Sequence, residues 1–301
     1  MLNSPLPPLL PNHDEIKQVL PALTVPVTLA NGEKVDVELM YLPFNDDDKP
    51  DLESFFACVK DSLLARFALT LQEMGELADD AGFDANENLF EIAANCLSTH
   101  TAQGELGELI LFIILDVYFN APKLFSKVAQ KQNRRMPVFG ADGVHGRLDD
   151  GRLTLYIGEA KLWEDYNGAA SDAVKSIATV AENFGTEFRL IRRNISLENV
   201  DEEACKTLLA AYNPFKKKSA VDDTIAPCFI GFSAESLFDA DYDQDEFIQA
   251  YLKLAEKHAC SLYQKATAES IKTDRLRVLL LPFVSVEDVV QQFIDYMGIV
   301  A

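Results

Sequence analysis

Residues 136–163, MPVFGADGVHGRLDDGRLTLYIGEAKLW, predict two strands joined by a tight turn. Asp150-Gly151 is typical of a two-residue hairpin turn, because both residues tolerate a positive φ. With this turn, the numbers of opposed residues add up to 301, and Asp142 lies across from Glu159. A turn one residue earlier would make the two carboxylates diagonal neighbours on the same face. Like charges so close together are destabilising unless something compensates them.

The second strand of this hairpin has an apolar face that ends in charged residues. By the strand period of two, that face carries Leu153, Leu155 and Ile157. Glu159 and Lys161 continue the same face. A half-buried pair of carboxylates needs a compensating charge, and a divalent cation between Asp142 and Glu159 supplies one. Mg²⁺ suits a few carboxylates plus water.

These residues carry a family resemblance. Asp142 followed by Glu159-Ala160-Lys161 resembles the D…ExK signature of the PD-(D/E)xK nuclease superfamily, with Ala at position 141 in place of the usual Pro. A wider block resembles the HamA nuclease family of the Hachiman antiphage defence system over about residues 85–290. That block consists of GELGELILFIIL (104–115), FGADGVH (139–145) and YIGEAKLWEDY (156–166).

The resemblance implies a DNA nuclease that depends on Mg²⁺ or Mn²⁺. Asp142, Glu159 and the Ala160 carbonyl would hold the metal, and Lys161 would position or deprotonate the attacking water. It also implies a HamB-like helicase partner that loads the nuclease on DNA and keeps it inactive until infection. The chain has no GxxxxGK[ST] motif, so it is not predicted to be an NTP-driven motor itself.

Two alternatives remain open at this point. Glu159 and Lys161 could form an ordinary ion pair at a strand end, in which case the chain would be a non-catalytic, acidic interaction protein. The site could also belong to a related nuclease that cleaves RNA. The trigger of activation, the cleavage specificity and the oligomeric state are not visible in the sequence.

A strongly apolar helix is predicted over residues 104–119, and it begins with Glu105 and Glu108. Acidic residues favour helix N-termini, which is one explanation for both. The other is that one of them reaches the metal, as a helix glutamate does in many relatives. Gly104, four residues before Glu108, resembles the spacing in some of those relatives and favours Glu108.

A basic stretch follows that helix, although the chain has a net charge of −21 and a pI near 4.5. The sequence between Val117 and Ala141 has no acidic residue and places lysines at a helical spacing of four. Its cationic residues are Lys123, Lys127, Lys131, Arg134 and Arg135. They predict either a solvated helix face or contacts to DNA phosphates. Lys175, in the helix predicted after Trp163, is a further candidate for nucleic-acid contact.

The composition of the chain argues against several classes of protein, namely freestanding DNA-binding, zinc-binding, disulfide-rich, secreted and membrane-spanning proteins. A freestanding DNA-binding protein is usually basic, so this acidic chain is expected to need a partner for strong DNA affinity. The five cysteines and four histidines are scattered without ligand spacing, which predicts neither zinc nor disulfides and fits a cytoplasmic protein. The start of the chain lacks signal-peptide features, and the longest apolar run is too short to span a membrane.

The predicted fold is α/β, with a mixed sheet flanked by helices, as in restriction-endonuclease-like PD-(D/E)xK proteins. Residues 86–301 would form this nuclease-like domain, with strands at 136–163, 227–234 and 275–283. Residues 1–85 would add an N-terminal hairpin around Asn31-Gly32 and helices beginning after Asp51.

Overall fold

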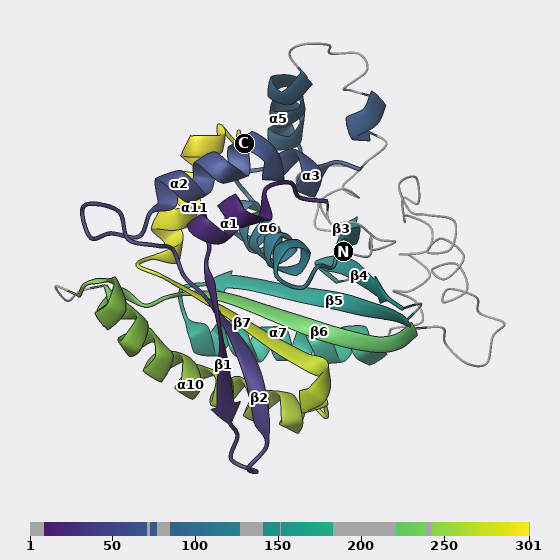
Figure 1. The fold of residues 1–301 in the computed structure, drawn as a ribbon, viewed down its shortest axis with the longest axis vertical. Helices are drawn as coiled ribbons and strands as arrows, with labels where there is room; N and C mark the ends of the chain where they lie inside the picture. Colours follow the sequence, from purple (N-terminus) through teal and green to yellow (C-terminus); the bar gives the residue numbers. More distant parts are fainter. Residues whose placement is uncertain are drawn as a thin grey trace.

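The computed structural model describes residues 9–70, 73–76, 85–126, 141–150, 152–182, 221–238 and 242–300. Within these ranges, seven strands form one sheet in the order β1-β2-β7-β6-β5-β4-β3 (Figure 1). The strands are β1 (Ala22–Thr28), β2 (Lys34–Met40), β3 (Lys123–Ser126), β4 (Gly143–Asp149), β5 (Arg152–Trp163), β6 (Val221–Ser233) and β7 (Leu276–Phe283). The central strands β2, β7, β6 and β5 run parallel, whereas β1, β4 and β3 pair antiparallel with their neighbours.

Helices cover both faces of this sheet (Figure 1). One face is covered by α1 (His13–Val19), α2 (Leu52–Cys58), α3 (Leu64–Ala68), α5 (Ala85–Asn95), α6 (Ala102–Val117) and α11 (Val286–Met297). The other face is covered by α7 (Tyr166–Glu182) and α10 (Gln244–Ala268). The predicted mixed sheet flanked by helices is therefore confirmed. No helix in the described ranges is long and apolar enough to cross a membrane.

The register of the β4–β5 hairpin is the predicted one. Asp149 pairs with Arg152, and the ladder continues in step to Gly143 and Gly158. Asp150 has a φ of 48°, the left-handed conformation that this type of turn requires. The turn dipeptide thus determines which residues meet at the open end of the hairpin.

The N-terminal hairpin is also confirmed, with Gly32 at a φ of 83° in its turn. Its second strand, β2, pairs in parallel with β7, with Val37 opposite Val278. The hairpin of residues 1–85 therefore continues the sheet of the predicted nuclease-like region, residues 86–301. Helix α2 begins after Asp51, whose carboxylate accepts a hydrogen bond from the Ser54 N–H at 3.0 Å, as expected of an N-cap.

Helix α6 packs closely on β5 because each of them places a glycine against a side chain of the other. A Cβ on Gly158 would lie 2.7 Å from Leu111 Cδ2, and one on Gly107 would lie 3.4 Å from the Leu162 side chain. Larger residues at these positions would push helix and strand apart. The close contact fixes the backbone of β5 immediately before Glu159.

Candidate active site

The open end of the β4–β5 hairpin brings Asp142 to the edge of β5. The strand ladder ends at Gly143, and the Asp142 N–H still donates to the Gly158 carbonyl at 3.1 Å. The Asp142 side chain then turns to the strand edge, where its Oδ2 accepts a hydrogen bond from the Ala160 N–H at 2.8 Å. Asp142 is thus held beside Glu159 by hydrogen bonds to the backbone of Gly158 and Ala160, the two neighbours of Glu159.

Glu159 and Lys161 lie on the face of β5 that α7 covers. The Lys161 Nζ is 2.9 Å from Glu159 Oε1 and 2.8 Å from Asp172 Oδ2 on α7. Ser176, one helical turn after Asp172, also bonds to the Glu159 carboxylate. The strand-end ion pair that was an open alternative is therefore present, and α7 extends it into a network.

The carboxylate pair is electrostatically strained. Burial, together with the nearby charge of Asp142, raises the pKa of Glu159 from 4.5 to about 7, although Lys161 and Ser176 act in the opposite direction. Burial alone would lower the pKa of Lys161, but the carboxylates of Glu159 and Asp172 outweigh it and raise that pKa. Lys161 is therefore an ammonium group at neutral pH.

The donor set fits a hard divalent cation. Asp142 and Glu159 are 8% and 6% exposed, so their mutual repulsion is poorly screened by water. A cation between them would relieve it. In the described ranges no three His, Cys, Asp or Glu side chains gather as a metal site. Two carboxylates still suit Mg²⁺, which keeps several waters and often takes its other ligands from a substrate phosphate.

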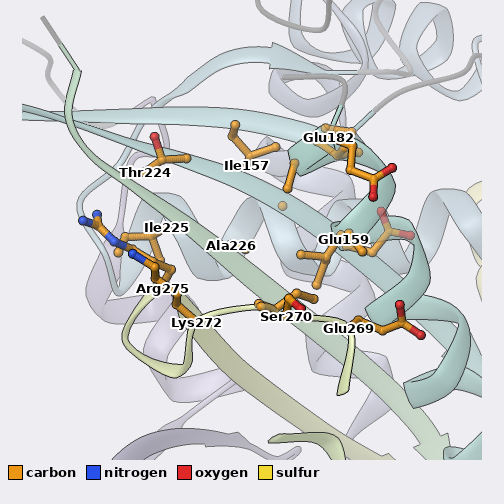
Figure 2. A pocket seen from close by; sticks show the side chains of 17 residues that line it. Ile157, Glu159, Glu182, Thr224, Ile225, Ala226, Glu269, Ser270, Lys272 and Arg275 are labelled. Atoms are coloured by element: carbon orange, nitrogen blue, oxygen red, sulfur yellow. The ribbon is translucent and has the colours of Figure 1, made fainter. Parts of the chain in front are cut away.

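A cavity of about 640 Å³ adjoins this site (Figure 2). Glu159 lies in its wall, next to residues of β5, β6, the second half of α7 and the loop between α10 and β7. This cavity could not be predicted from the sequence, because it forms between segments that are far apart in the chain.

A family model described as HamA matches residues 19–297 of the 301 residues. The chain belongs to the HamA family. This membership indicates a component of the Hachiman antiphage defence system. The resemblance inferred for residues 85–290 is thus confirmed, and the family match also includes the β1–β2 hairpin. No curated protein matches the chain.

Among the residues that the structure describes, neither Glu105 nor Glu108 of α6 joins a metal-binding group of three or more His, Cys, Asp or Glu side chains in this HamA family member. Glu105 is buried and accepts hydrogen bonds from the Ser98 N–H at 3.2 Å and the Thr101 hydroxyl at 2.6 Å. It therefore ties the loop before α6 to the helix. Glu108 is partly buried on α6, which covers the face of the sheet opposite α7. Its assignment as a metal ligand stays a prediction.

Lys123 requires a correction. It lies in strand β3, not in a helix, and its ammonium donates to the carbonyls of Arg66, Phe67 and Leu69 at 2.6, 2.9 and 3.2 Å. Burial lowers its pKa to about 7, although Glu73 and Asp116 act in the opposite direction. A spacing of four residues between lysines is therefore not enough to predict a helix at Lys123. Lys123 thus binds the last carbonyls of α3, a structural role.

The other cationic candidates have different outcomes. Lys175 is exposed on α7, next to Ser176 in the chain, so its assignment to nucleic acid stays a prediction. Four further candidates lie outside the described residues, namely Lys127, Lys131, Arg134 and Arg135. Two aromatic residues near the site, Trp163 and Tyr166, have separate environments. Tyr166 is buried and stacks on His258 at 3.7 Å, whereas Trp163 is 38% exposed.

Lys123→Met is expected to lower the free energy of unfolding by about 1–3 kcal/mol, because it removes charged hydrogen bonds to three carbonyls. It should leave the salt dependence of DNA binding by the HamA complex unchanged. Urea unfolding and DNA titration at several salt concentrations check both. A smaller salt slope with unchanged stability would return Lys123 to the DNA-binding surface.

Glu159 is also expected to make stability depend on pH. The pKa of Glu159 is higher in the folded protein than in the unfolded chain. The contribution of this carboxyl group to the free energy of unfolding is therefore fully present below pH 4.5 and is lost as the pH rises through about 7. The groups facing it are Asp142, Lys161, Ser176 and Cys228. Without divalent cations, the free energy of unfolding of wild type relative to Glu159→Gln should fall by about 1–3 kcal/mol between pH 5 and pH 8. Equal pH profiles for the two proteins in chelator-containing urea titrations would contradict this.

Proposed function

We propose that this HamA family protein is the nuclease of its defence system and hydrolyses DNA phosphodiesters at Asp142, Glu159 and Lys161. The observation that carries the proposal is the meeting of two buried carboxylates and an ammonium group at the open end of the β4–β5 hairpin. The order of helices and strands supports a restriction-endonuclease-like fold, in which such a group performs phosphodiester hydrolysis.

The cation would be Mg²⁺ or Mn²⁺, held by Asp142, Glu159 and the Ala160 carbonyl. When bound, it would lower the pKa of a water molecule and neutralise charge on the phosphate. Hydrolysis adds the water oxygen to phosphorus, breaks the bond to one bridging oxygen and delivers a proton to that oxygen. No redox partner is needed.

Lys161 would act through its charge. Because Glu159 and Asp172 keep it protonated, it is suited to orient the attacking water and to offset negative charge in the transition state. A protonated lysine is a poor general base, so water positioning is favoured over deprotonation. Asp172 would hold the ammonium in place.

A partner helicase would supply the DNA. The net charge of −21 disfavours strong unaided binding to a polyanion. A helicase that brings DNA to the nuclease would overcome this repulsion, and it would also provide control over an enzyme able to destroy cellular DNA.

The competing function is that of a non-catalytic, acidic interaction protein. The observation that favours it is the closed network in which Lys161 already has two carboxylate partners. In that case the network would only join β5 to α7, and no divalent cation would be needed.

Incubation with plasmid DNA separates the two functions. We expect cleavage when the chain, its helicase partner, ATP and Mg²⁺ are present, and no cleavage when EDTA replaces Mg²⁺. Parallel reactions without the helicase and with an RNA transcript test partner loading and sugar specificity. Intact DNA in every reaction, with the complex correctly assembled, would favour the interaction protein.

A further inference from the structure

We propose that the cavity beside Glu159 holds one nucleotide of a single DNA strand, so that the site acts on unpaired or splayed DNA. This inference rests on the proposed nuclease function. The phosphate to be cleaved would lie at the Glu159 end, and the neighbouring phosphate of the same nucleotide would lie at the end formed by Lys272 and Arg275.

Apolar side chains from three elements line the cavity. Ile157 from β5, Ile177 from α7 and Ile225 from β6 contribute to its walls. Ala178 and Ala181 of α7 also line it, and their small side chains leave space between the helix and the sheet. Its volume of about 640 Å³ is within the range of roughly 300–1,000 Å³ typical of sites for small ligands. A nucleotide base has two flat faces of low polarity that such walls accept.

The two ends of the cavity differ in charge. Figure 2 shows Glu159, Glu182 and Glu269 toward one end and Lys272 and Arg275 toward the other. Lys272 is exposed, and Arg275 lies at the same end, with its Nε 4.0 Å from the exposed carboxylate of Asp274. The basic end therefore suits a phosphate directly, whereas the acidic end suits a phosphate only through a cation.

This polarity matches a nucleotide that carries a phosphate on each side of its sugar. One phosphate would pair with Lys272 and Arg275, and the other would share the cation of Asp142 and Glu159. The acidic end would repel a phosphate when no cation is bound there. Binding of the nucleotide across both ends should therefore depend on the cation.

The burial of the site indicates the form of the DNA. The side chains of Glu159 and Lys161 are only 7% and 17% exposed, because α7 covers them. The phosphates of a regular duplex lie on the outside of a wide, stiff rod and cannot enter a cavity beneath a helix. Enzymes that enclose a whole nucleotide, such as those that modify a base, take it out of the duplex or use a single strand, and a nucleotide in this cavity would need the same freedom. A helicase partner would produce single strands of this kind.

Direct binding tests the cavity independently of cleavage. Thymidine 3′,5′-bisphosphate carries a phosphate at each end and serves as the probe, with Ca²⁺ present, in isothermal titration calorimetry. Wild type should bind it, and Ala178→Trp, which fills the cavity, should weaken binding at least about tenfold. The double variant Lys272→Glu, Arg275→Glu should have the same effect. Lys253→Glu is the matched control, because Lys253 is exposed on α10 away from the cavity and should leave binding unchanged.

Cleavage by the assembled complex completes the test. Wild type should cut a single-stranded oligonucleotide faster than a blunt duplex of the same sequence when ATP is absent, and both cavity variants should slow this cutting. If wild type cuts both substrates equally and the double variant cuts as wild type does, the cavity inference is overturned while the nuclease function stands. If wild type cuts nothing, the nuclease function fails. The cavity inference fails as well if wild type does not bind the bisphosphate, or if the cavity variants bind it as tightly as wild type does. The double variant changes partly or fully exposed side chains, so a folding defect in Ala178→Trp does not block the test.

Discussion

Glu159→Gln is expected to reduce DNA cleavage by the assembled complex roughly 10³-fold or more. The substitution keeps the shape of the side chain but removes a charged metal ligand, and a bound cation is worth several kcal/mol of transition-state stabilisation. Phage protection should be lost together with cleavage. Cleavage rates on plasmid DNA and plating efficiency of phage measure the two effects.

Glu256→Gln is the matched control for this variant. Glu256 is exposed on α10 and does not line the cavity, so the same chemical change there should leave cleavage near the wild-type rate. Glu159→Gln should remain folded and keep its partner, because a neutral side chain relieves the repulsion from Asp142. Wild-type cleavage by a folded Glu159→Gln complex would contradict the nuclease function.

Lys161→Ala should slow cleavage by about 10²–10³-fold, the usual cost of losing one positioned charge in an active site. It should also lower the free energy of unfolding by about 1–3 kcal/mol, because Glu159 loses its nearest cation. The comparison with Asp172→Asn separates catalysis from structure. Asp172 pairs with the same ammonium at 2.8 Å, but its side chain is 46% exposed.

Asp172→Asn is expected to retain at least about a tenth of the wild-type activity, since a half-exposed ion pair contributes roughly 1 kcal/mol or less. Both measurements should therefore show the larger loss in Lys161→Ala, and its loss of cleavage should occur in enzyme that is still folded at the assay temperature. If both lose stability in parallel and both cut DNA as wild type does, Lys161 is a structural residue and the interaction protein is the better account.

The hairpin of the site was predictable because its determinants are local. The Asp150-Gly151 turn fixes the register, and the strand period then fixes which side chains share a face. These two rules place Asp142 close to Glu159 and put Lys161 on the same strand face as Glu159, whereas the role of the three residues as an active site stays a prediction. The same reasoning located the β1–β2 hairpin around Gly32.

The partners of those side chains were not predictable in the same way. Asp172 and Ser176 reach the site because α7 packs on one particular face of β5, which depends on the whole sheet. Their spacing of four residues indicates only that they share one side of a helix. The prediction that Lys123 lies on a helix was wrong for a related reason. Only the packing of β3 against the end of α3 reveals the carbonyls that this lysine binds.

The parallel pairing of β2 with β7 is another result that depends on long-range contacts. Residues 37 and 278 are far apart in the chain, and neither local sequence nor periodicity indicates that they meet. The cavity beside Glu159 arises from the same kind of arrangement, because its walls come from β5, α7, β6 and the loop before β7.

Anomalous diffraction from crystals soaked in Mn²⁺ tests most directly whether Asp142 and Glu159 share a divalent cation beside Lys161. We expect an anomalous peak within coordination distance of both carboxylates in wild type, and its loss in Glu159→Gln crystals soaked in the same way. The contrary result would be a wild-type crystal without a peak, with the Asp142 and Glu159 side chains pointing apart.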